Sequence, residues 1–284
     1  MTPLPARIVG IYGFDFMHPF TVGGIDFVPL YKYPECEKRA SDPDSFQLTG
    51  YGRFRAPTEN DQDDADKVRL ITAGMTFIEQ QQVIAMLVDI SQGDTVDAFV
   101  ETDAFRHPVA SPMPRHALGD LVQPDAWSRN SRAEFLSMFL QRFRVEHPGD
   151  ALRQAFFRHI EIARLATPYV EIHHFLAFSA LELLARSLGP YHNQKNAAVP
   201  IADLLNARGF SVQQVEVERW THARNKAFHE GQLTTPDPNG GVDIHLADQL
   251  VPITSVLGDV LLKLLPFDDG HINWNRWRDR MAFC

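Results

Sequence analysis

Near residue 131 the sequence changes from a strand-like pattern to a helical one. From there to residue 265, helix-forming segments with apolar faces are separated by short connections. The pattern predicts six helices, at 131–146, 150–166, 168–188, 200–208, 212–230 and 251–265. Short connections between amphipathic helices are typical of a bundle, so we predict an all-helical domain over residues 132–284.

End signals support two of these helices. Thr167 and Pro168 fit the cap and the first position of the third helix, and Gly189-Pro190 fits its end. Gly231 fits the end of the fifth helix, because glycine adopts the left-handed conformation that commonly closes a helix.

The first 106 residues favour strands. Three segments rich in Val, Ile, Phe and Tyr are separated by Gly, Pro and Asp, at 7–16, 25–33 and 46–54. Residues 57–66 have the composition of an acidic, solvated loop. Residues 68–90 then resemble one helix, in which Gly74 is a candidate position for a break, and a short strand is predicted at 96–100.

These patterns predict an α+β protein. Residues 1–106 would form an N-terminal domain with a small antiparallel sheet plus a helix. Residues 107–131 contain four prolines and are interpreted as a linker. The helical domain would follow at 132–284.

Charge and composition exclude some functions. The net charge of −9 argues against a protein that binds nucleic acid through bulk positive charge. Residues 1–131 hold 11 basic and 19 acidic residues, whereas the rest of the chain holds 16 basic and 17 acidic residues.

Charged residues and a proline interrupt the longest apolar run, at 246–267, and the N-terminus lacks a secretory pattern. With only two cysteines, the chain is expected to be cytoplasmic and without a membrane segment.

Common cofactor and metal signatures do not occur. There is no GxGxxG, no phosphate-binding GxxxxGK, no HExxH, no GxSxG and no CxxC. Adjacent helical residues point about 100° apart, so His173 and His174 do not form a chelating pair. We expect one of these rings to pack in the bundle and the other to face water. The prediction is therefore that the chain uses no metal and no cofactor.

Residues 220–233, WTHARNKAFHEGQL, carry the most informative pattern. Arg224 falls within the apolar stripe of the predicted helix, where a guanidinium needs a partner or a ligand. Asn225 and His229 are four residues apart and share a face. A cation, an amide and a titratable imidazole therefore lie together near a helix end.

This segment resembles the signature of the HEPN superfamily. That signature consists of an Arg, often followed directly by a polar residue, and a His, with four to six residues between the Arg and the His. It reads here Arg224-Asn225-Lys226-Ala227-Phe228-His229. The helix YVEIHHFLAFSALELLARSLG is similar to the second long helix of these bundles, and Glu182 matches its inward polar residue. Three other Arg–His pairs have a similar spacing, and the strongest competitor is Arg153–His159.

The resemblance covers residues 132–266, about half of the chain. It implies a metal-independent endoribonuclease that acts as a homodimer and leaves 2′,3′-cyclic phosphate ends. In that reading, His229 serves as base or acid, Arg224 stabilises the phosphate charge and Asn225 orients the His or the substrate. Glu182 and Lys226 would support the site. The partners implied are an RNA substrate, a second copy of the chain and a regulatory partner or phage-derived trigger.

By analogy with antiviral and toxin–antitoxin systems, residues 1–106 would act as a sensor or regulatory domain. Two alternatives stay open. One is a non-catalytic HEPN-like module that binds RNA, a nucleotide or a protein. The other is an unrelated helical interaction protein, which a buried His229 packed against Trp220 or Phe228 would favour.

Overall fold

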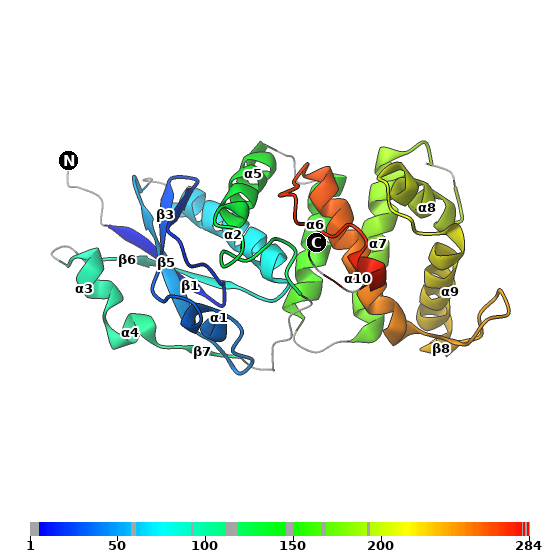
Figure 1. Ribbon diagram of the computed structural model, residues 1–284, viewed down its shortest axis with the longest axis horizontal. Helices are drawn as coiled ribbons and strands as arrows, with labels where there is room; N and C mark the ends of the chain where they lie inside the picture. The colour runs from blue at the N-terminus through cyan, green and yellow to red at the C-terminus, as the bar shows by residue number, and fades with distance from the viewer. Residues whose placement is uncertain are drawn as a thin grey trace. The chain divides into compact units, whose positions relative to one another are not determined.

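A computed structural model describes residues 6–57, 61–91, 94–111, 119–145, 150–165, 169–191, 194–279, 281 and 283. The chain divides into two compact units, residues 1–145 and 146–284 (Figure 1). The first unit is built on an antiparallel sheet and the second is mostly helical. The predicted α+β class is therefore confirmed.

Five antiparallel strands form the main sheet of the first unit. They are β1 (Arg7–Tyr12), β2 (Phe20–Val22), β3 (Ile25–Pro29), β5 (Leu48–Phe54) and β6 (Ile84–Asp89). Their order across the sheet is β2-β3-β5-β1-β6, and every residue of β1 is buried. A strand buried on both faces requires a covering layer on each side of the sheet. Two short strands, β4 (Ser45–Phe46) and β7 (Val109–Ala110), pair with each other.

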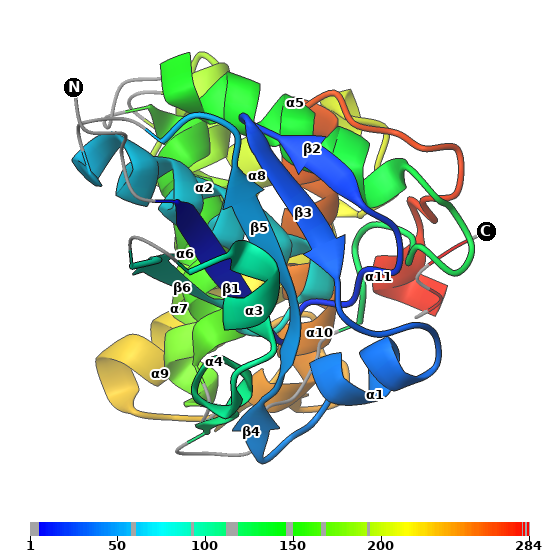
Figure 2. The ribbon, with the colours of Figure 1, turned by 90° about the vertical axis from the view of Figure 1, so that its left-hand side faces the viewer.

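Helices α3 (Val96–Val100) and α4 (Asp103–Arg106) cover one face of the sheet, and α3 lies in front of the strands in Figure 2. Ile8 and Tyr12 of β1 belong to a buried apolar cluster with Phe105 of α4. The Tyr12 hydroxyl donates a hydrogen bond of 3.0 Å to the Phe105 carbonyl. The side chain thus buries its ring and still satisfies its polar end.

Helices α2 (Asp61–Glu79) and α5 (Ser131–Val145) form the layer on the other side of the sheet (Figures 1 and 2). The rings of Phe77 in α2 and Phe135 in α5 stack at 5.4 Å. A Cβ atom at Gly74 would lie 2.8 Å from the Leu136 side chain. Gly74 therefore permits the close approach of the two helices and does not break α2.

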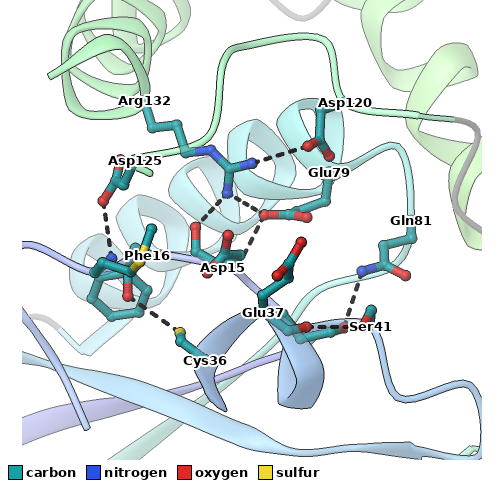
Figure 3. A network of polar contacts seen from close by, with 12 residues as sticks. Asp15, Phe16, Cys36, Glu37, Ser41, Glu79, Gln81, Asp120, Asp125 and Arg132 are labelled. Atoms are coloured by element: carbon teal, nitrogen blue, oxygen red, sulfur yellow. Dashed lines mark hydrogen bonds and ion pairs between the residues drawn. The ribbon is translucent and has the colours of Figure 1, made fainter. Parts of the chain in front are cut away.

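A buried polar network joins these helices to the segment that follows β1 (Figure 3). The Arg132 guanidinium, 1% exposed, contacts the Glu79 carboxylate and the Asp15 carbonyl. Its Nη2 lies 3.5 Å from Asp120. Nearby, α1 (Glu35–Ala40) contributes Cys36, whose thiol donates to the Phe16 carbonyl at 3.2 Å. The network fixes the start of α5 to the rest of the first unit.

Three local predictions for the first unit are wrong. Residues 84–89, expected at the end of a helix, form β6, which pairs with β1 from Ile84 to Asp89. Residues 96–100, expected as a strand, form α3, because the Thr95 side chain caps it by accepting from the Ala98 N–H. Helix α2 also begins at Asp61, within the expected acidic loop, where carboxylates suit a helix N-terminus.

Helix α7 (Val170–Leu188) is central to the second unit. It packs against α6 (Ala151–Arg164), α8 (Ala198–Ala207), α9 (Gln214–Glu230) and α10 (Leu246–Leu264). The hairpin of β8 (Thr234–Thr235) and β9 (Ile244–His245) connects α9 to α10, and α11 (Arg276–Asp279) packs on α10. The predicted helices are present; α10 begins five residues before its predicted start and contains Pro252. The predicted cap at Thr167-Pro168 lies outside the described residues.

The boundary between the units differs from the predicted one. Helix α5, placed in the helical bundle by its sequence, packs on α2 and β2 of the first unit. Leu121 and Val122, in the expected linker at 107–131, are buried. Much of that segment, as far as it is described, thus belongs to the first unit, and the division comes after residue 145.

Within the described part of the chain, none of the helices combines the length and the apolarity needed to cross a lipid bilayer.

Candidate active site in the helical unit

Helix α9 carries the Arg–Asn–His pattern on its last two turns. The helix begins after Gln213, whose N–H donates to the Glu216 carboxylate at 2.8 Å. It ends at Gly231, which has a φ of 67° in the left-handed region, as predicted. Local sequence therefore fixes both ends of α9 and sets where Arg224 and His229 lie along it.

A pocket of about 580 Å³ opens between α7 and α9. Phe178 and Glu182 of α7 line it together with Arg224 and Asn225 of α9. Other polar lining residues are Lys195, Asn196, Glu218, Thr221 and His222. Three of the five residues singled out in the sequence, Glu182, Arg224 and Asn225, thus meet in one pocket.

The Arg224 guanidinium lies against aromatic rings. Its Cζ is 5.6 Å from the Phe178 ring centre and 5.9 Å from that of Phe228. Nη1 donates to the Asn225 side-chain oxygen at 2.8 Å, while Nε is buried and has no hydrogen-bond partner within the described residues. The described residues also place no carboxylate within 4.0 Å of it. The charge of Arg224 is therefore available to an anionic ligand in the pocket.

A buried imidazole lies close to this guanidinium. His174 is 1% exposed, and its ring stacks on Phe178 at 6.2 Å. Burial, and secondarily the positive charge of Arg224, lowers the pKa of His174 to about 4. His173 is also buried, at 8% exposure, so the expectation that one ring of this pair faces water is wrong. Both histidines lie on α7, which packs against other helices on several sides. A pattern of two residues does not reveal that packing.

His229 lies outside the pocket. Its side chain is exposed and forms no hydrogen bond among the residues that the structure describes. Asn225 binds Arg224 and not His229, and Lys226 forms an ion pair of 2.7 Å with Glu230. A buried His229 would have favoured an unrelated interaction protein, and the structure does not show one.

Glu182 is held by its own helix. Its carboxylate accepts from the Arg186 guanidinium at 2.9 Å and 2.8 Å, and Arg186 also donates to the Gln194 carbonyl at 2.7 Å. Glu182 therefore connects the pocket wall to the segment before α8. In this structure the Glu182 carboxylate serves mainly to position Arg186, and less as a free acid.

Exposed apolar side chains surround the end of α9. Val170, at the start of α7, packs with Ala227 of α9 against the buried cluster of Ala223, Ile244 and Leu246. The rings of Phe175 in α7 and Phe228 in α9 lie 4.8 Å apart, so this part of α7 lies beside the C-terminal end of α9. In this region Phe228 is 47% exposed and Ile172 is 42% exposed, and Tyr169 and Leu233 are exposed as well. Large apolar side chains exposed together are typical of an interaction surface.

His222 lines the pocket but was not predicted as a site residue from the sequence. Its Nε2 is 3.0 Å from the Thr235 hydroxyl, which links α9 to the β8 strand. The spacing of three between His222 and Asn225 puts them on one helix face and was a usable signal. Lys195 and Asn196 reach the pocket from the connection before α8, which no local pattern indicates.

The competing Arg153–His159 pair does not form such a site. His159 is 1% exposed, and burial lowers its pKa to about 3. Arg153 lies over the Phe157 ring at 5.3 Å. An imidazole buried in the helical core cannot reach a polymeric substrate, so the α9 pair is the better candidate.

The described residues contain no cluster of three or more His, Cys, Asp or Glu side chains suited to a metal ion. No protein-family model matches this chain, and no curated protein or solved structure matches it. The resemblance to the HEPN superfamily therefore depends on the residues of α7 and α9.

Proposed function

We propose that this chain is a metal-independent endoribonuclease of the HEPN type. The observation that supports it most directly is the Arg224 guanidinium, which lines an open pocket without a carboxylate partner among the described residues. A guanidinium held against aromatic rings keeps its fork geometry and can bind a phosphate through two hydrogen bonds.

In the proposed reaction, a nitrogen of His229 takes the proton of a ribose 2′-hydroxyl, and the 2′-oxygen attacks the neighbouring phosphorus. The bond from phosphorus to the 5′-oxygen breaks, and an imidazolium protonates that oxygen. The products are a 2′,3′-cyclic phosphate and a 5′-hydroxyl. Arg224 stabilises the negative charge on the phosphorane, and Asn225 holds the guanidinium in place.

The proposed site combines two copies of the chain. Arg224 and His229 are five residues apart, so their directions on α9 differ by about 140°. A two-fold partner docked on the apolar end of α9 would bring a second His229 and Arg224 to the same phosphate. The exposed Phe228 next to His229, and the exposed Tyr169 and Ile172 at the start of α7, support this arrangement.

The activity is tested by incubating mixed-sequence RNA with the full chain in EDTA. We expect cleavage with cyclic phosphate ends in the wild type, and a loss of at least about a hundredfold in His229→Ala and Arg224→Ala. His245→Ala is the matched control, since it removes another exposed histidine of the same unit. Equal cleavage by all four proteins would locate the activity elsewhere.

The dimer is tested separately by sedimentation of the full chain. Ile172→Asp introduces a charge at the apolar end of α9 and should shift the protein to the monomer mass and remove cleavage. Val242→Asp, on the exposed loop between β8 and β9, is the control and should leave the mass unchanged.

A non-catalytic module that binds a phosphorylated ligand is the second candidate. The observation that favours it is the position of His229, which does not line the pocket that contains Arg224. RNA binding that requires Arg224 but is unaffected by His229→Ala, with no cleavage, would support this candidate.

The proposed biological setting is phage defence or growth arrest in the cytoplasm. In this proposal the acidic first unit senses a trigger or restrains the nuclease. A separate antitoxin or a nucleotide-transferring enzyme would be an additional regulator.

A further inference from the structure

The first unit has a cavity of about 640 Å³ that the proposed nuclease does not use. Its lining includes His18, Lys32, Tyr33, Asp125 and Trp127. They come from the segment after β1, the segment before α1 and the segment before α5. The buried network of Arg132 lies beside it, and Figure 3 shows Asp125 at the edge of that network.

Two large aromatic side chains of this cavity face water. Trp127 is 78% exposed and Tyr33 is 58% exposed. Flat aromatic rings that are left in water beside a cavity offer stacking surfaces for a planar ligand. A folded chain gains nothing from such exposure, so these two rings favour a ligand with an aromatic ring system.

Asp125 offers a hydrogen-bond acceptor in the same cavity. Its side chain is 7% exposed, and its Oδ2 accepts the N–H groups of Met17 at 3.0 Å and of His18 at 3.4 Å. The described residues give its other oxygen, Oδ1, no hydrogen bond. A carboxylate fixed by two backbone N–H groups, with one oxygen left open, is suited to bind an N–H donor of a ligand.

The cationic side chain of Lys32 narrows the class of ligand further. It lines the cavity together with His18 and is exposed. A cationic ligand would be repelled by Lys32, whereas a phosphate would be attracted. The cavity thus combines stacking rings, an acceptor for N–H and a donor for phosphate.

We propose that this cavity binds a guanine nucleotide, with the base stacked on Trp127 and Tyr33 and its N–H edge on Asp125. Guanine presents two adjoining N–H donors, N1–H and N2–H, to a carboxylate. In the other bases an acceptor atom lies next to the N–H group and would meet the carboxylate. Lys32 contacts the phosphate. This proposal is independent of the nuclease activity proposed for the second unit.

The base can come from a free nucleotide or from a single-stranded nucleic acid. The two sources are distinguished by titrating the full chain with guanosine 5′-monophosphate and with a DNA tetramer that contains one guanine. DNA lacks the 2′-hydroxyl and is not a substrate for the proposed cleavage. Tighter binding of the mononucleotide indicates a free ligand, and tighter binding of the tetramer indicates a strand.

Calorimetric titration with the four nucleoside monophosphates tests the site. We expect guanosine monophosphate to bind most tightly, and both Trp127→Ala and Tyr33→Ala to weaken it by about five- to a hundredfold. Leu188→Ala removes an exposed apolar side chain of the second unit and should leave binding unchanged. Lys32→Ala should weaken binding of the monophosphate but not of guanosine.

Asp125→Asn replaces the acceptor by a group that also donates, and should abolish the preference for guanine. Far-UV circular dichroism checks that each variant keeps its fold. The proposal is overturned if the wild type shows no saturable binding of guanosine monophosphate at roughly millimolar concentration. It is also overturned if Trp127→Ala and Tyr33→Ala bind as tightly as the wild type.

Discussion

Replacing His174 should remove part of the acid sensitivity of the protein. The folded structure lowers the pKa of this ring to about 4, mainly through burial and secondarily through the charge of Arg224. The unfolded chain would titrate near the ordinary value of 6.5. Between these two pH values the unfolded state binds more protons than the folded state, so the free energy of unfolding falls as the pH falls.

The size of the effect follows from the two pKa values. The lowering of the pKa from 6.5 to about 4 corresponds to about 3 kcal/mol once the pH is below both values. Integrating the linkage relation gives a loss of about 2 kcal/mol between pH 7 and pH 5. His159, which is also buried with a low pKa, adds its own loss in the same window.

The assay is urea unfolding of wild type and His174→Phe, followed by circular dichroism at a series of pH values. Phenylalanine keeps the stacking on Phe178 and removes the titration, and the two ring nitrogens have no hydrogen-bond partner among the described residues. The variant should therefore be close to wild type at pH 7 and more stable by about 2 kcal/mol at pH 5. The contribution of His159 cancels in the difference.

His245→Phe, at an exposed ring, is the control variant for the substitution itself. If the stability curves of wild type and His174→Phe stay parallel from pH 7 to pH 5, the reasoning is refuted. His174 would then be protonated in the folded state or accessible to water.

Three further substitutions, together with one control variant, test the fold by urea unfolding at pH 7. Arg132→Met should cost about 3–5 kcal/mol because it leaves Glu79 buried without its cation, whereas Arg164→Met, at a half-buried surface ion pair, should cost under about 1 kcal/mol. Equal costs for both would contradict this interpretation of the network. Gly231→Ala should cost about 1–2 kcal/mol, since its φ of 67° strains any residue with a Cβ. Gly50→Ala should cost more than Gly231→Ala, because its Cβ would lie 2.6 Å from the Val28 carbonyl oxygen and against the Phe16 ring.

Sequence patterns predicted the second unit well because its signals are local. Gly231 ends α9 through its own backbone conformation, and the amphipathic pattern before it is complete within one segment. The same locality placed Arg224 and Asn225 on one helix. It did not place Glu182 beside them, which rested on the family resemblance, nor Lys195, which reaches the pocket from another segment.

Predictions failed where the structure of a segment is decided by the element that it packs against or pairs with, and not by its own sequence. Residues 80–82 are three glutamines, which are good helix formers, yet Gln80 adopts a φ of 51° and the chain turns into β6. Pairing of β6 with the buried strand β1 outweighs the helical propensity of this segment. In the same way, the apolar face of α5 has a helical period but does not indicate which unit it packs against.

The position of α5 has a consequence for any attempt to separate the two units. Its buried face consists of Phe135, Leu136, Phe139, Leu140 and Phe143, each 3% exposed or less. Leu136 and Phe139 pack on Gly74 of α2, and Leu140 lies against Gly23 of the β2–β3 hairpin.

A fragment of residues 130–284 would expose these side chains, each worth about 1.5–3 kcal/mol of burial, and should elute as aggregates in size-exclusion chromatography. A fragment of residues 146–284 lacks this face and should elute as a defined species. Only the second fragment gives a clean test of whether the first unit restrains the proposed nuclease, with restraint predicting faster RNA cleavage than by the full chain. Equal, monodisperse elution of both fragments would contradict the assignment of α5 to the first unit.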